Sequence, residues 1–167
     1  MKDLTILENG ELIDFVYYDI AGKHIRDNVK DWTEPDQLTV AVDQLQGPVK
    51  TTYLIGVLNQ QVMNGGFIQY YDNSFGRFAY ETLDALKEIK ATKTFDLLRE
   101  SIELINPKGR TNADFKELII NRNYENYYEI LGDQLHALDS KYYELGDDEN
   151  LDQLLGDYLK VRITELK

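Results

Sequence analysis

Apolar residues recur three or four positions apart along most of the chain, which is the spacing of one face of an α-helix. These stripes predict helices near residues 11–22, 36–45, 53–64, 79–90 and 93–105, then from about 112, over 124–143 and around 151–158. Only Leu4–Leu7 has an extended pattern. The chain has 167 residues and no repeat or evident linker. The pattern therefore predicts an all-α fold, a single compact domain over 1–167 with about seven to nine helices.

One predicted helix ends within the segment Asn64-Gly65-Gly66-Phe67-Ile68-Gln69-Tyr70-Tyr71-Asp72-Asn73. A Gly-Gly pair after a helical run is an expected C-terminal cap, because glycine adopts the left-handed conformation without a Cβ clash. We expect the stretch 67–72 to add one short turn of helix. Six amide side chains gather around this point: Asn59, Gln60, Gln61, Asn64, Gln69 and Asn73. They could hydrogen-bond a ligand or satisfy the backbone groups that helix ends expose, and we favour the second interpretation.

The predicted helix 124–143 has two opposite faces. At 100° per residue its apolar side chains fall within about 100° of arc, and they are Tyr124, Tyr127, Tyr128, Leu131, Leu135, Leu138 and Tyr142. Glu125, Glu129 and Asp133 lie on the opposite side, ~6 Å apart along the axis, where like charges repel. The acidic run continues with Glu144, Asp147, Asp148, Glu149, Asp152 and Asp157. These carboxylates form either a solvated helix face or a surface that binds a partner.

Charge restricts the class of that partner. The formal net charge is −12, from 18 Lys and Arg against 30 Asp and Glu. Residues 124–159 hold ten acids and one base, Lys141, whereas residues 50–123 are nearly neutral. Nucleic acid and anionic membranes repel such a protein, so we expect binding to neither. A basic protein is a permitted partner, although acidity also serves solubility.

Catalytic and metal-binding motifs are missing from the sequence. The chain has no cysteine, and its two histidines, His24 and His136, lie outside any metalloprotease motif. Nucleotide-binding glycine loops and the nucleophile-elbow motif are absent. We therefore expect no enzymatic activity, no metal and no cofactor. There is also no long apolar run and no signal-peptide core, which predicts a cytoplasmic protein.

The segment Asn64–Asn73 resembles the signature of the bacterial DNA-mimic protein family, Asn-Gly-Gly-Phe-x-Gln-Tyr/Phe. The similarity spans approximately residues 50–105, and the matching positions are Asn64, Gly65, Gly66, Phe67, Gln69, Tyr70 and Asn73. The chain departs from the family at Met63-Asn64, where an Asn-Asn pair is usual, and at Lys90, where glycine is usual. The resemblance implies a small all-helical domain in which the signature joins two helices and has a structural role. The best-known members are acidic proteins that occupy the DNA-binding surface of other proteins.

Resemblance and charge together predict an acidic protein-binding module that mimics double-stranded DNA. Its partner would be a basic DNA-binding protein such as a transcription factor. Duplex DNA carries one charge per ~1.7 Å, so a single acidic ladder with ~6 Å spacing is insufficient. Two adjacent acidic helices, or a homodimer, would be needed. Two alternatives stay open: a helical domain that binds a small ligand or catalyses a reaction at the 64–73 amide cluster, and an immunity or accessory protein that binds through an acidic patch.

Overall fold

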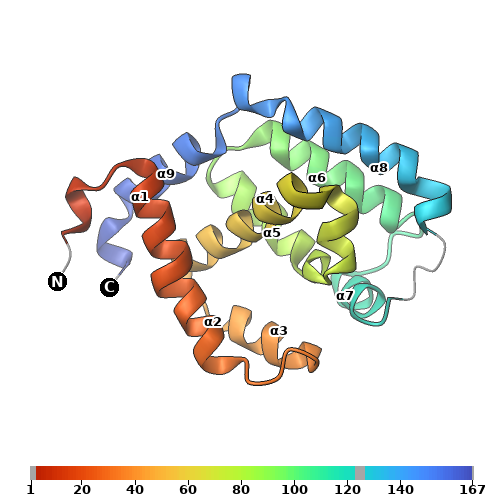
Figure 1. The fold of residues 1–167 in the computed structure, drawn as a ribbon, viewed down its shortest axis with the longest axis horizontal. Coiled ribbons are helices and arrows are strands. Elements are labelled where there is room, and N and C mark those ends of the chain that lie inside the picture. The colour runs from red at the N-terminus through yellow and green to blue at the C-terminus, as the bar shows by residue number, and fades with distance from the viewer. Residues whose placement is uncertain (1–2, 123–126, 167) are drawn as a thin grey trace. The chain divides into compact units, whose positions relative to one another are not determined.

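The computed structural model describes residues 3–122 and 127–166, and these residues form helices and no strand (Figure 1). The all-α prediction is confirmed. The chain divides into two compact units: unit 1 is Met1–Gly56 with Leu151–Lys167, and unit 2 is Val57–Asn150. Their boundary falls within the long helix α4, Gly47–Asp72. That residues 1–167 form one domain stays a prediction. No helix in the described ranges is long and apolar enough to cross a membrane.

Unit 1 begins with one nearly continuous helical stretch. A short 3-10 turn at Leu4–Ile6 comes first, so the expectation of extended structure there was wrong. The chain continues as α1 (Asn9–Asp14), a π-helix (Phe15–Ala21) and α2 (Gly22–Asn28), and thus exceeds the predicted range 11–22 at both ends. Helix α3 (Pro35–Asp43), the start of α4, α9 (Leu151–Val161) and a 3-10 turn at Ile163–Glu165 complete the unit.

Two close approaches hold unit 1 together. Helix α1 packs against α9, where Asn9 fills the space beside Gly156 and donates from Nδ2 to the Asp157 carboxylate at 3.1 Å. The π-helix carries Tyr17, whose ring covers Gly56 and stacks on Tyr53 with ring centroids 6.0 Å apart. Burial raises the pKa of Tyr17 to about 12.

Unit 2 contains the rest of α4, a 3-10 turn at Phe75–Phe78, α5 (Ala79–Glu88), α6 (Thr92–Ile105), α7 (Asn112–Ile120), α8 (Tyr127–Tyr143) and a 3-10 turn at Leu145–Asp147. Helix α6 packs between α5 and α8 (Figure 1). The core consists of fully buried side chains from every helix, among them Leu58, Phe67, Tyr71, Leu86, Leu98, Phe115 and Leu135.

Helix α4 is interrupted where the sequence predicts it. Gly65 has φ −159° and ψ 24°, and Gly66 has φ 75° and ψ −177°, so neither residue is helical. The chain resumes helical geometry at Phe67. We call this interruption the glycine break. It divides α4 into a long first part and the short turn that was predicted for residues 67–72.

Candidate functional site

The glycine break is built around the carboxylate of Asp139, which α8 contributes. Its Oδ1 accepts a hydrogen bond from the Phe67 amide at 2.7 Å, and the Asp139 side chain is 6% exposed. Asp139 therefore caps the turn that begins at Phe67. A Cβ on Gly66 would collide with this carboxylate, and φ 75° independently disfavours a side chain there. Gly66 thus meets a steric and a conformational requirement together.

The amide side chains around the break bond to one another. Gln61 Oε1 accepts from Gln69 Nε2 at 3.0 Å and from Asn73 Nδ2 at 2.7 Å. Gln69 Oε1 accepts from Asn64 Nδ2 at 2.8 Å. Four of the six predicted amides are therefore linked across the break, which favours their structural interpretation. A fifth, Asn59, accepts from the hydroxyl of Tyr142 at 3.1 Å.

The C-terminal end of α8 holds both parts of α4. Tyr143 donates from its hydroxyl to the Val62 carbonyl at 3.1 Å, just before the break. Tyr142 packs edge-on against Phe67, just after it, with ring centroids 5.8 Å apart. The predicted apolar face of this helix is buried at Leu135, Leu138 and Tyr142, whereas Leu131 is half-buried. Tyr124 lies outside the described residues, as do the side chains of Tyr127 and Tyr128.

The acidic ladder on the other face of α8 is described in part. Asp133 is exposed, as predicted, and so is Glu144 just beyond the helix. Glu125 lies outside the described residues, and so do the side chains of Glu129 and Asp147. In the described part of the chain, no basic side chain lies within ion-pair distance of Asp133 or Glu144.

Two other predicted partner-binding acids have partners inside unit 2. Asp148 pairs with the Lys93 ammonium at 2.6 Å. The carboxylate of Glu149 accepts from the backbone amides of Lys93 and Thr94, both at 2.8 Å, and from the Thr94 hydroxyl at 2.7 Å. Glu149 therefore satisfies the amides that the start of α6 would otherwise leave open. The charges of Asp148 and Glu149 are therefore less available to a partner protein than the sequence alone implies.

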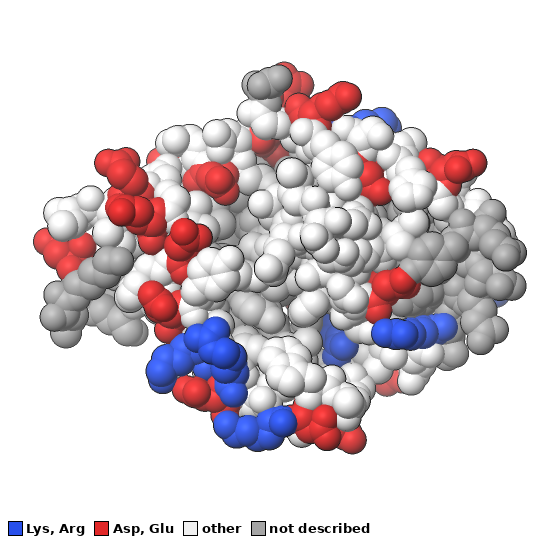
Figure 2. All heavy atoms as spheres, in the orientation of Figure 1, with Lys and Arg blue, Asp and Glu red and all other residues white. Residues whose placement is uncertain are grey.

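The last two predicted acids lie in unit 1. Asp152 is exposed in the first turn of α9. Asp157 accepts from Gln153 Nε2 and from Asn9 Nδ2, and these two hydrogen bonds hold the pKa of the Asp157 carboxyl below its usual range. Figure 2 shows Asp and Glu side chains in separate groups on the face drawn, with uncharged side chains between them. The predicted acids therefore belong to two units, Asp152 and Asp157 to unit 1 and the others to unit 2.

With this geometry established, comparison with known proteins gives the family. Residues 43–162 match the model of the family described as DMP19-like protein. The chain belongs to the DMP19-like family. The matched range contains the glycine break and all nine predicted partner-binding acids. A search of curated proteins and a search of solved structures found no match to the chain.

The role of one acid in this DMP19-like chain was not predicted from the sequence. In the sequence, Asp139 counts only as one more acid in the acidic excess, whereas in the structure it is buried against the glycine break. A signal was present, because Asp139 lies four residues after Leu135 and so about 40° away on the helix, at the edge of the apolar arc. An acid at that position must find a hydrogen-bond donor or stay unpaired in the core.

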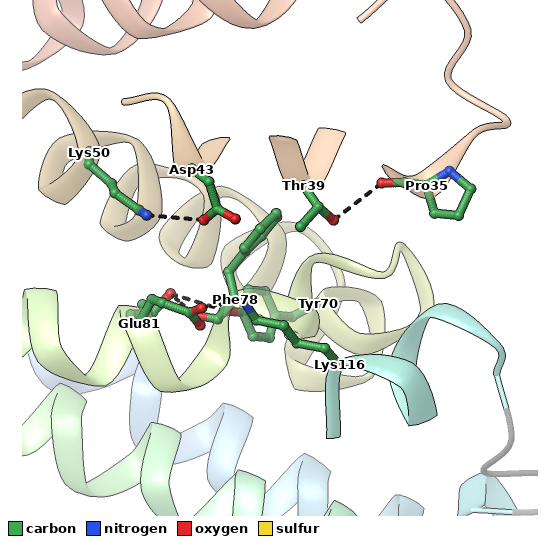
Figure 3. Close-up of polar contacts among 9 residues, drawn as sticks. Pro35, Thr39, Asp43, Lys50, Tyr70, Phe78, Glu81 and Lys116 are labelled. Carbon is green, nitrogen blue, oxygen red and sulfur yellow. Dashed lines mark hydrogen bonds and ion pairs between the residues drawn. The ribbon is translucent and has the colours of Figure 1, made fainter. Parts of the chain in front are cut away.

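A half-buried charged pair in unit 2 joins α5 to α7. Figure 3 shows Lys116 and Glu81 pointing toward one another beside the rings of Phe78 and Tyr70, and the two form an ion pair. Burial and the nearby Glu81 charge raise the pKa of the Tyr70 hydroxyl, and its contact with Thr82 opposes them. Separately, in unit 1, Lys50 pairs with Asp43 at 3.2 Å. These pairs join neighbouring elements, and we assign them no chemistry.

The described residues hold no cluster of side chains suited to binding a metal ion. There, no three His, Asp or Glu side chains come close enough to hold a metal ion. An open depression of about 250 Å³ lies in unit 1, lined by Asn28, Asp36, Gln37, Val40, Ala41 and Gln44. It is not the 64–73 amide cluster to which the small-ligand alternative assigned a site.

Proposed function

We propose that this DMP19-like chain is an acidic protein-binding module that mimics double-stranded DNA and occupies the DNA-binding surface of a basic protein, such as a transcription factor. The observation that carries the proposal is the pair of exposed carboxylates on one side of α8, Asp133 and Glu144. The net charge of −12 and the resemblance to the bacterial DNA-mimic family support it. The chain binds this basic protein directly, and it binds neither nucleic acid nor membrane.

Asp133 and Glu144 are placed so that they form a row of negative charge along α8, which we call the acidic row. Asp133 and Glu144 are eleven residues apart, which places them about 20° from each other around the helix and ~16 Å apart along it. Ala137 and Ser140 lie between them on this side, and both are exposed and small. The only base in residues 124–159, Lys141, lies 4.0 Å from Glu100 of α6. Lys141 is therefore paired with Glu100 rather than with Asp133 or Glu144.

One row is sparser than the phosphates of a duplex, which carries one charge per ~1.7 Å. A homodimer would supply a second row and bring the charge density closer to that of DNA. The alternative of an acidic patch that does not mimic DNA, as in an immunity or accessory protein, needs no such duplication. Competition with duplex DNA distinguishes DNA mimicry from a plain acidic patch, because only a DNA mimic must exclude duplex DNA from its partner.

The test immobilises the chain, exposes it to bacterial lysate at 0.1 M salt and identifies the captured proteins. Duplex DNA of 20 base pairs is then added in increasing amounts. We expect the captured set to consist of basic DNA-binding proteins that the duplex releases. Capture should be lost at 1 M salt, where the Debye length falls from ~10 Å to ~3 Å.

The matched variants are Asp133→Lys and Asp84→Lys, which make the same charge change at exposed positions of unit 2. We expect Asp133→Lys to lower capture at least tenfold and Asp84→Lys to change it little, because α5 lies outside the acidic row. Captured proteins that duplex DNA does not release would overturn the mimicry and favour the plain acidic patch. Equal capture by both variants would show that the acidic row, Asp133 and Glu144, is only a solvated helix face.

A further inference from the structure

A group of uncharged side chains is exposed beside the glycine break, within unit 2. Three contacts bring it together: the Tyr143 hydroxyl bonds the Val62 carbonyl at 3.1 Å, Asp139 occupies the space beside Gly66, and His136 Nδ1 lies 3.3 Å from Asp139 Oδ2. The end of the first part of α4 and the last two turns of α8 therefore form one continuous surface. We call Met63, Asn64, His136, Ser140 and Tyr143 the break patch.

The break patch exposes two large side chains with apolar atoms. Met63 is 55% exposed and Tyr143 is 48% exposed. Tyr143 is held in place by its hydrogen bond to Val62, so little side-chain freedom is left to lose on binding. Tyrosine and methionine are also enriched at protein interfaces relative to the rest of the surface. Tyr143 reaches the carbonyl of the residue that precedes Met63, and a half-exposed ring and a flexible thioether are both suited to receive an apolar side chain.

Carboxylates stand at both ends of this patch. Glu144 follows Tyr143 directly, and Asp133 lies one helical turn before His136. An apolar centre with a charged rim is the usual anatomy of a protein interface. The charge of the rim selects the occupant: a second copy of this chain would bring like charges together, and nucleic acid or an anionic membrane would be repelled.

We propose that the break patch is the centre of the partner-binding surface and receives a basic protein segment whose apolar side chain, flanked by lysine or arginine, packs on Met63 and Tyr143. The choice of a basic partner rests on the proposed function, whereas the apolar centre rests on the exposed side chains alone. Carboxylates by themselves attract any polycation, so the apolar centre would supply selectivity that charge cannot.

The probe is a pair of synthetic helical peptides of equal positive charge, each fluorescently labelled. Both are built from alanine and lysine, and one carries two leucines between its lysines where the other carries alanine. Anisotropy at 0.1 M and 0.5 M salt gives the two affinities. We expect the leucine peptide to bind at least fivefold more tightly, with the difference maintained at the higher salt because it does not depend on charge.

Three variants locate that difference. Met63→Ala should remove most of the leucine peptide's advantage while leaving the alanine peptide unchanged. Ile130→Ala, which truncates an exposed side chain on another side of α8, is the matched control and should leave the advantage intact. Asp133→Lys should weaken both peptides alike. Circular dichroism and the melting temperature establish that each variant is folded.

The outcomes separate the two proposals. If Met63→Ala leaves the leucine advantage intact, or if no advantage exists, the break patch is not the docking centre, and recognition by charge still stands. If Asp133→Lys changes neither peptide, recognition through the acidic row is wrong. A leucine advantage that Met63→Ala still removes in that case would support the break patch without the proposed function.

Discussion

The carboxylate of Asp139 occupies the space that a side chain on Gly66 would need. From there its Oδ1 accepts a hydrogen bond from the Phe67 amide nitrogen at 2.7 Å. The backbone conformation at Gly66 and the burial of Asp139 therefore depend on each other, although the two residues lie far apart in the sequence. Glycine is required because the aspartate approaches so closely, and the aspartate is satisfied because the chain turns at the glycine. This relationship explains physically why glycine stands at position 66, inside a long helix of this chain.

Gly66→Ala should destabilise the protein by about 3 kcal/mol, because it combines a left-handed backbone with a collision in a buried site. Gly65→Ala is the matched control. Its φ of −159° is open to any residue, and its Cβ would displace the Gln69 side chain from its hydrogen bonds with Gln61 and Asn64. We expect it to cost about 1 kcal/mol or less. Urea unfolding measures both, and equal stabilities for the two variants would contradict this account of Gly66.

Asp139→Ala should cost about 1–3 kcal/mol, because it leaves the buried Phe67 amide without an acceptor. Asp139→Asn should cost less, since its amide oxygen can still accept that hydrogen bond. Hydrogen exchange at the Phe67 amide provides a local readout, and we expect rapid exchange only in the alanine variant. Unchanged protection at Phe67 in Asp139→Ala would show that the bond contributes little.

Glu149→Ala should cost about 1 kcal/mol of stability, the usual loss when a helix N-terminus loses its capping side chain. Glu144→Ala removes a nearby exposed carboxylate that does not cap α6, so it should stay within about 0.5 kcal/mol of the parent protein. Thermal or urea unfolding distinguishes them. If the two variants are equally stable, the bonds from Glu149 to Lys93 and Thr94 do not stabilise the start of α6.

Acid should weaken the protein partly through Asp157. Hydrogen bonds from Gln153 and Asn9 keep its folded-state pKa below the ordinary value of 3.8. The unfolded chain therefore binds the proton more readily, and this contribution is present above about pH 4 and lost as pH falls through the folded-state pKa. Asp157→Asn should thus lose less stability than the parent between pH 5 and pH 3. Urea midpoints across that range, with parallel curves as the contradicting result, test the prediction.

Local pattern predicted most of the secondary structure. Helical periodicity predicted the all-α fold and the burial of Leu135, Leu138 and Tyr142, and the Gly65-Gly66 pair predicted the break, because each depends on residues within a few turns. It failed at Leu4–Ile6, where hydrogen bonds from Thr5 to the Asp3 side chain favour a turn over extended chain. So short a segment is decided by such local bonds, which the hydrophobic pattern does not record.

Charge counting could not tell which carboxylates face a partner, because a carboxylate's role depends on donors that are often distant in sequence. By itself the sequence determined the helices, the position of the break and the acidic excess, all of which follow from neighbouring residues and composition. Tertiary structure alone decided that Asp139 is buried against Phe67, that Glu149 caps α6 and that Asp133 and Glu144 are left exposed. The physical reason is that a buried or capping carboxylate needs backbone amides, and here those amides come from segments 72 and 55–56 residues away.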